Sequence, residues 1–188
     1  MRIVGGSHKG RRLTAPDGRA TRPTSDRARE SLFNILAHSP LVDLDQALVV
    51  DAFAGSGALG LEALSRGAAH VWFLETHAAA LAAIRANVAE LREGERATIL
   101  RADATKPPPP PRACTLALVD APYEKELSAP CLAGLASRGW LAPGALAVVE
   151  VAAREALTPP PGFSVEAERG YGAARLVFLS FDGDPAAT

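Results

Sequence analysis

Residues 47–60, ALVVDAFAGSGALG, run from a short apolar stretch through a glycine-rich loop into the start of an apolar helix. Glycines at positions 55, 57 and 60 let the backbone approach a ligand closely. A glycine motif of this kind is weak evidence on its own, because it occurs in dinucleotide sites and also in plain tight turns. Its position between a strand and a helix favours a nucleotide-like ligand bound at this loop.

The alternation of strand and helix continues on the carboxyl side of the loop. Short apolar strands are expected at residues 47–51, 71–74, 97–100, 116–119 and 145–151. Helices are expected after the glycine loop as far as Arg66-Gly67, and at residues 78–91 and 127–137. This order predicts an α/β protein with a parallel sheet covered on both faces and ligands at the carboxyl ends of the strands.

The two ends of the chain have a different pattern. Residues 163–168 and 175–181 alternate like an antiparallel strand pair, and residues 2–4 and 11–13 predict a small hairpin. A helix capped by Thr24 or Ser25 is expected to follow the hairpin. The five prolines at 107–111 predict a stiff spacer, and the tail after residue 181 is expected to fray.

Acidic side chains close three of the predicted strands. Asp51, Glu75 and Asp103 each stand at a carboxyl end, where Glu75 suits ribose hydroxyls, Asp103 suits an adenine amino group and Asp51 suits anchoring of the loop. Three carboxylates around one loop suit an adenosine that bears a positively charged tail. They oppose a pyrophosphate, because the negative phosphates would face several carboxylates.

The fourth strand leads into Asp120-Ala121-Pro122-Tyr123, the most specific signal in the chain. A planar exocyclic amine is a poor nucleophile, because its lone pair is delocalised into the ring. Asp120 and an adjacent backbone carbonyl can accept from its two N–H bonds and favour the reactive, pyramidal nitrogen. Tyr123 can stack on the base. A sulfonium methyl donor is a strong leaving group, so positioning and electrostatics suffice without an enzyme nucleophile.

The formal net charge of −1 conceals a basic amino-terminal end. Residues 1–29 contain eight basic and two acidic side chains, a net charge of +6. A basic end on an acidic domain indicates a polyanionic partner, although a solvated arm would carry the same charge. Candidate contacts to such a partner in and next to the hairpin are Arg2, Lys9, Arg11, Arg12, Arg22 and Arg27.

Composition excludes several other classes of site. Cys114 and Cys131 have neither CxxC spacing nor a histidine cluster nearby, so we expect reduced, buried thiols and no metal site. No apolar stretch approaches the roughly 20 residues that cross a bilayer. The amino terminus has no apolar region typical of a signal peptide, which favours a cytoplasmic protein.

Three segments together resemble the bacterial small-subunit ribosomal RNA guanine-N2 methyltransferases of the RsmD type. They are the opening residues 1–6, MRIVGG; residues 22–34, RPTSDRARESLFN; and residues 51–67, DAFAGSGALGLEALSRG. The resemblance covers nearly the whole chain. It implies a Rossmann-like class I methyltransferase fold with a mostly parallel seven-stranded sheet, S-adenosylmethionine as the methyl donor and a guanine of small-subunit ribosomal RNA as the acceptor.

The resemblance also implies roles for particular residues. The loop Gly55-Ser56-Gly57 would contact the donor's amino acid portion, Glu75 its ribose, and Asp103 with Ala104 its adenine, and Phe53 would belong to the same donor site. Asp120, Pro122 and Tyr123 would surround the target base, and the hairpin with residues 22–29 would meet RNA. One position departs from the family pattern of Asp-Pro-Pro and an aromatic residue. Ala121 replaces the first proline, so the turn is expected to be less rigid than in the family pattern.

The expected organisation is a basic hairpin and loop at residues 1–23, an S-adenosylmethionine-binding methyltransferase domain at 24–181 and a tail at 182–188. The expected partner is ribosomal RNA or an assembling small ribosomal subunit, met by a monomer. Other acceptors stay open, because a DNA base or a glutamine amide also presents a planar nitrogen. A nicotinamide-dependent oxidoreductase would leave residues 120–123 and the basic hairpin unexplained. A non-catalytic RNA-binding module would leave the strand-end acids unexplained.

Overall fold

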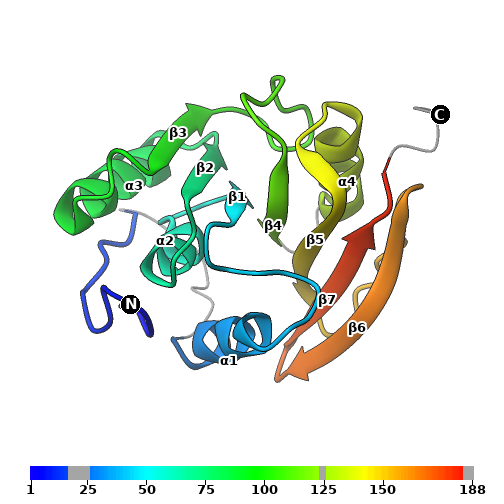
Figure 1. Ribbon diagram of the computed structural model, residues 1–188, viewed down its shortest axis with the longest axis horizontal. Helices are drawn as coiled ribbons and strands as arrows, with labels where there is room; N and C mark the ends of the chain where they lie inside the picture. Colours follow the sequence, from blue (N-terminus) through cyan, green and yellow to red (C-terminus); the bar gives the residue numbers. More distant parts are fainter. Residues whose placement is uncertain (17–25, 123–125, 184–188) are drawn as a thin grey trace.

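The computed structural model describes residues 1–16, 26–122 and 126–183 (Figure 1). Its strands are β1 (Leu48–Ala52), β2 (His70–Glu75), β3 (Ala97–Arg101), β4 (Cys114–Asp120), β5 (Leu141–Ala152), β6 (Phe163–Tyr171) and β7 (Ala174–Phe181). Its helices are α1 (Asp26–Ala37), α2 (Ala58–Ser65), α3 (Ala78–Leu91) and α4 (Ser128–Ser137). The predicted caps Thr24 and Ser25 lie outside the described residues.

The strands form one seven-stranded sheet in the order β3-β2-β1-β4-β5-β7-β6. The neighbours from β3 to β5 pair in parallel, whereas β7 pairs antiparallel with both β5 and β6. This is the predicted seven-stranded, mostly parallel sheet with an antiparallel carboxyl-terminal strand pair. The order reverses beside β1: the chain runs outward from β1 through β2 to β3, and then crosses back to β4 on the other side of β1. Ligands bind at such a switch point in open α/β sheets.

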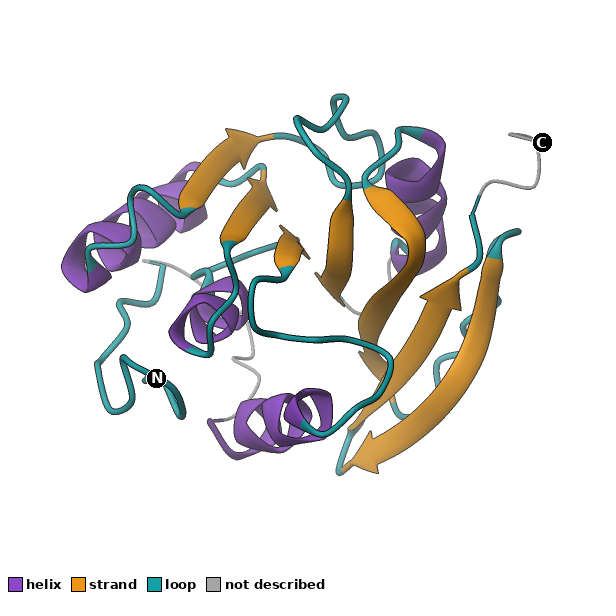
Figure 2. Ribbon diagram, viewed as in Figure 1, coloured by secondary structure: helices purple, strands orange, loops and turns teal. Residues whose placement is uncertain are grey.

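Helices cover the two faces of the sheet unequally (Figure 2). One apolar cluster joins α1, α2 and α3 to the sheet through residues such as Phe33, Leu61 and Ile84. A second cluster on the opposite face includes Cys131 and Leu135 of α4. The two predicted thiols are buried and unpaired with each other, and burial raises the pKa of Cys114 to about 12.

The amino-terminal hairpin is short and packs on the domain. A single antiparallel bridge joins Arg2 to Arg12, and the Ile3 N–H donates to the Arg11 carbonyl at 2.9 Å. Ile3 and Leu13 point into the first apolar cluster. The Ser7 N–H also donates to the Ser65 carbonyl at the end of α2, at 2.7 Å. The hairpin is therefore fastened to the helix that follows the glycine loop.

One strand is longer than the sequence predicts. β5 begins at Leu141, because Leu141 pairs with Cys114 before a register shift carries Leu146 opposite Leu116. The proline run is packed against the domain at its start: Pro107 is buried, and the Pro108 carbonyl accepts from the Trp140 indole N–H at 2.7 Å, whereas the side chains of Pro108, Pro109 and Pro111 are exposed. No helix in the described part of the chain is long and apolar enough to cross a membrane.

Candidate active site

Acidic side chains lie at the carboxyl edge of four adjacent parallel strands. Glu75 ends β2, Asp51 is near the end of β1, Asp120 ends β4, and Glu150 of β5 is the register partner of Asp120. Each stands two residues after a strand side chain of the first apolar cluster. Because side chains alternate along a strand, all four lie on the face that α2 and α3 cover. The topology thus brings together the predicted Asp51, Glu75 and Asp120.

Asp51 is buried within this group of acids. Its Oδ2 accepts from the Gly60 N–H in the first turn of α2 at 2.9 Å. Burial raises the pKa of the Asp51 carboxyl well above its ordinary value. The hydrogen bond from Gly60 opposes this rise, and the charges of Asp120 and Glu75 add to it. Such a site favours a positively charged ligand, which relieves the mutual repulsion of the carboxylates.

The glycine loop has the backbone that its sequence predicts. Phe53, Gly55 and Gly57 have positive φ angles of 59°, 56° and 78°. Gly60 lets α2 lie close to β2, because a Cβ there would come within 2.4 Å of the Phe73 ring. By contrast, a Cβ on Gly55 would meet only the Phe53 carbonyl, at 3.9 Å. The backbone at Gly55 is therefore open enough for a ligand to approach.

Glu75 organises the start of the loop from β2. Its Oε2 accepts from the Gly55 N–H at 2.9 Å, and its Oε1 accepts from the Thr76 and His77 N–H groups at 2.7 and 2.8 Å. A carboxylate offers about four lone-pair sites. These three bonds leave one on Oε2, which suits a ribose hydroxyl.

Asp103 shapes the turn after β3. Its Oδ1 accepts from the N–H and the hydroxyl of Thr105 at 2.8 and 2.7 Å. These two bonds lower the pKa of Asp103; burial opposes them, and the charge of Lys106 adds to the lowering. The Ala102 N–H donates to the Glu75 carbonyl at 3.1 Å, and Ala104 is buried. The predicted adenine side is thereby joined to the predicted ribose side.

The acceptor segment is described only in part. Asp120 lies at the end of β4, Ala121 is buried and Pro122 is exposed. Tyr123 lies outside the described residues. Glu150 was not among the sequence-based candidates. The sequence signal that could have found it is a single charged residue inside the apolar run of β5.

Most of the predicted RNA-binding side chains are at the surface. Lys9, Arg12 and Arg27 are exposed, Arg2 forms an ion pair with Asp26 at 3.5 Å, and Arg11 forms one with Glu90 at 2.7 Å. Arg22 lies outside the described residues. The exposed cations extend along the hairpin and the first turn of α1.

Arg29 corrects the expectation that residues 22–29 meet RNA as a block. Its side chain is fully buried, and it forms ion pairs with Asp26 at 2.8 Å and with Glu62 at 3.8 Å. Glu62, also fully buried, accepts from the Val4 N–H at 2.8 Å and from Arg66 at 2.7 Å. The sequence analysis missed this network of the hairpin, α1 and α2. One part of it could have been predicted, because Glu62 and Arg66 are four residues apart on a helix, a spacing that favours an ion pair.

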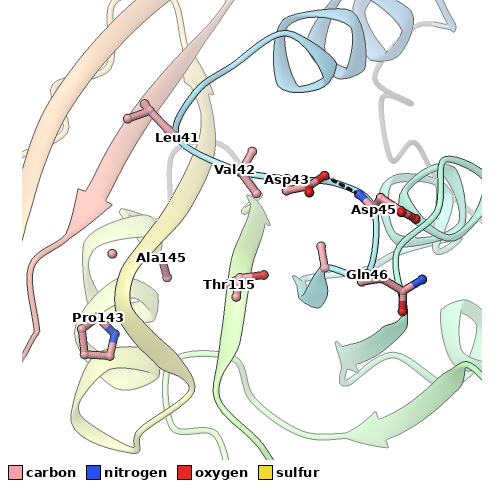
Figure 3. A pocket seen from close by; sticks show the side chains of 10 residues that line it. Leu41, Val42, Asp43, Asp45, Gln46, Thr115, Pro143 and Ala145 are labelled. Carbon is pink, nitrogen blue, oxygen red and sulfur yellow. Dashed lines mark hydrogen bonds between the residues drawn. The ribbon is translucent and has the colours of Figure 1, made fainter.

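A cavity of about 310 Å³ lies at the opposite, amino-terminal edge of the parallel strands (Figure 3). Asp43, Asp45 and Gln46 line it from the segment before β1, and Thr115 lines it from the start of β4. It is therefore separate from the row of acids. Among the described residues, no group of three or more His, Cys, Asp or Glu side chains is arranged to hold a metal ion.

The sheet order, the glycine loop after β1 and the acids at the strand ends define a class I methyltransferase. The solved structure of yhhF from Escherichia coli, described as a methyltransferase, superimposes with a TM-score of 0.82 and 34% identity over 98% of this chain and 99% of that one. The methylase HI0767 of Haemophilus influenzae superimposes with a TM-score of 0.77 and 27% identity, over 97% and 98% of the two chains.

The chain belongs to the family whose model is described as Conserved hypothetical protein 95, which matches residues 1–180. A relative named ribosomal RNA small subunit methyltransferase D, from Escherichia coli strain K12, is 39% identical over 92% of this chain and 85% of its own. The protein of the same name from Haemophilus influenzae is 32% identical over 92% of this chain and 89% of its own. The family resemblance stated from the sequence is confirmed.

Proposed function

We propose that this protein transfers a methyl group from S-adenosylmethionine to the exocyclic N2 of a guanine in small-subunit ribosomal RNA. The observation that carries the proposal is the group of Glu75, Asp51 and Asp120 at the carboxyl edge of β2, β1 and β4, around the glycine loop. The names of the relatives support the choice of ribosomal RNA.

The residues present suit the donor. S-adenosylmethionine, when bound, supplies a methyl group activated by a positively charged sulfonium. The Gly55 backbone is open to the donor's amino acid portion, Oε2 of Glu75 keeps a lone pair for its ribose, and Asp103 with Ala104 borders its adenine. Carboxylates at Asp51 and Asp120 attract the positive charge, and they would repel the pyrophosphate of a nicotinamide dinucleotide.

The acceptor half orients the target amine. Asp120 accepts from one N–H of the guanine N2, and the Ala121 carbonyl accepts from the other. Pro122 and Tyr123 complete the base site, with Tyr123 stacking on the ring. Methyl transfer leaves a positive charge on the nitrogen, which then loses one of its two protons to the Asp120 carboxylate, and no enzyme nucleophile takes part. The rate enhancement comes from holding the nitrogen in line with the methyl group and from charge stabilisation.

Ribosomal RNA, free or in an assembling small subunit, is the proposed partner of a cytoplasmic monomer. The exposed Lys9, Arg12 and Arg27 of the hairpin and α1 would contact its phosphates. Contacts of this kind make binding strongly dependent on salt, because each neutralised phosphate releases counterions.

Methylation mapping tests the proposal. Purified protein and labelled S-adenosylmethionine would be given ribosomal RNA from a strain lacking the protein, a DNA duplex and a glutamine-containing peptide. We expect one N2-methylguanine in small-subunit RNA and no label in the other two acceptors. Label only in DNA or peptide, or thermal stabilisation by nicotinamide dinucleotides rather than by S-adenosylhomocysteine, would contradict it.

A further inference from the structure

A buried asparagine joins the basic hairpin to the glycine loop. Asn87 lies on α3 with 2% of its surface exposed, on a face whose other members, Ile84, Val88 and Leu91, belong to the first apolar cluster. A buried amide costs free energy unless its hydrogen-bonding groups find partners. The partners of Asn87 come from two segments far from α3 in the sequence.

Three hydrogen bonds fix the orientation of the Asn87 amide. Its Oδ1 accepts from the Thr14 N–H at 2.8 Å, while its Nδ2 donates to the Thr14 carbonyl at 3.0 Å and to the Ser56 carbonyl at 2.9 Å. A backbone N–H can only donate and a carbonyl can only accept. A flipped amide would therefore lose all three bonds. In the observed orientation, the side chain binds the Thr14 segment and the Ser56 segment at the same time.

The bond to Ser56 holds the centre of the donor loop. In the peptide between Ser56 and Gly57, the carbonyl accepts from Asn87, and the N–H of Gly57 donates to the Ala54 carbonyl at 2.7 Å. This peptide is thus fixed at both of its polar groups. Glu75 holds the preceding Gly55 N–H. Both Asn87 and Glu75 therefore hold the loop conformation.

The bond to Thr14 holds the second arm of the hairpin. Thr14 lies three residues after Arg11 and two after Arg12, and both arginines are exposed. We propose that Asn87 is a positioning residue that couples RNA binding at the hairpin to donor binding at the glycine loop, which rests on the proposed function. RNA bound to the arginines keeps Thr14 on Asn87, and Asn87 then keeps the Ser56 peptide in its donor-binding orientation.

This arrangement makes the two ligands cooperative. Coupling between two binding sites is reciprocal, so the donor raises the affinity for RNA by the factor by which RNA raises the affinity for the donor. The chain also offers a matched control. His8 joins the same hairpin to Glu93 beyond α3 at 2.5 Å, and neither residue has a hydrogen bond to the loop. Losing that contact loosens the hairpin and leaves the bridge through Asn87 intact.

The test measures the affinity for transcribed, unmethylated small-subunit ribosomal RNA with and without saturating S-adenosylhomocysteine. For the wild type, we expect S-adenosylhomocysteine to raise the RNA affinity by about fivefold or more. Asn87→Ala should reduce this ratio to about one, and so should Thr14→Pro, which removes the Thr14 N–H and fixes φ at an exposed position. His8→Ala should keep the wild-type ratio even if it melts at a lower temperature. Circular dichroism checks that each variant is folded.

The outcomes separate the inference from the proposed function. If the wild type binds both ligands with a ratio of one, or if Asn87→Ala and Thr14→Pro keep the wild-type ratio, the coupling role is wrong and the methyltransferase function stands. If His8→Ala also lowers the affinity ratio to one, the coupling depends on docking of the whole hairpin, and the role of Asn87 is overturned. A wild type that binds neither S-adenosylhomocysteine nor the RNA contradicts the proposed function itself.

Discussion

The proposed donor half and the proposed acceptor half of the site differ in how they meet the backbone and the surface. In the donor half, Asp51, Glu75 and Asp103 each accept a hydrogen bond from a backbone N–H, so these carboxylates hold the surrounding backbone in place. In the acceptor half, Asp120 ends β4 opposite Glu150, and the chain then reaches the surface at Pro122. Because the donor-half carboxylates hold this backbone, we expect their loss to affect both stability and donor binding. Because Asp120 faces the target amine in the proposed mechanism, we expect its loss to affect the chemical step.

Asp120→Ala should have the largest effect. The variant loses an acceptor that favours the reactive form of the target amine, and we expect methyl transfer to fall by about 100-fold or more. Binding of S-adenosylhomocysteine should be nearly unchanged. Single-turnover methylation at saturating donor measures the chemical step, and Asp43→Ala at the opposite edge of the sheet is the matched control. An Asp120→Ala variant as fast as the wild type would show that the acceptor role is wrong.

Glu75→Ala should weaken donor binding and stability, the opposite of the pattern expected for Asp120→Ala. It removes the acceptor of three backbone N–H groups and a partner for the donor's ribose. We expect donor binding to weaken by about 1–3 kcal/mol, the cost of losing a charged hydrogen bond. The free energy of unfolding should fall as well, whereas Glu95→Ala, on an exposed turn, should change neither quantity. Calorimetric titration and urea unfolding give the two values. Unchanged donor affinity would remove Glu75 from the donor site.

Asp51→Asn should stabilise the protein and weaken donor binding. Folding raises the pKa of Asp51, so the wild type loses stability as the pH rises from about 4, the unfolded value. Asparagine is neutral and can still accept from the Gly60 N–H. We expect the variant to be more stable by about 1 kcal/mol at neutral pH, a typical gain when functional strain is removed. Urea unfolding at several pH values measures it, and a gain that does not shrink toward acidic pH would contradict the assignment.

Ala121→Pro should have the smallest effect. Ala121 already precedes Pro122, which favours the extended backbone that a proline also accepts. The substitution should keep methyl transfer within a fewfold and change stability by no more than about 1 kcal/mol. A loss of more than about tenfold in single-turnover rate would show that the Ala121 N–H has a role, because its removal is the main change that proline makes.

The sequence predicted the sheet because its strands are short apolar runs bounded by glycine, proline and charged residues. It also predicted Asp51, Glu75 and Asp103 as acids around one loop, since parallel strands end at one edge. The structure adds Asp120 and Glu150 to the row formed by Asp51 and Glu75, and it places Asp103 in the turn after β3. Glu150 was missed because it lies inside an apolar run. Arg29 was misplaced because a charge count does not report burial. Its spacing from Leu32, Phe33 and Leu36 does put it on the apolar face of α1.

Other contacts could not be predicted from local patterns. The bridge from Thr14 through Asn87 to Ser56 joins three segments that no periodicity relates. The register shift in β5 depends on how Leu141 pairs with Cys114, which a strand pattern does not specify. Both features follow from tertiary packing rather than from the propensity of either segment.

The packed proline run has a consequence for spectroscopy. The chain has two tryptophans, and Trp72 and Trp140 both belong to the apolar cluster under α4, with ring centroids 6.3 Å apart. Trp140 is tied to the Pro108 carbonyl a few residues after Asp103. Tryptophan fluorescence, excited at wavelengths where tyrosine absorbs little, therefore observes only this side of the sheet, including the segment beside the proposed adenine position. Tryptophan emission during a donor titration reports on that segment without any attached dye, and the hairpin side of the molecule contributes no tryptophan signal.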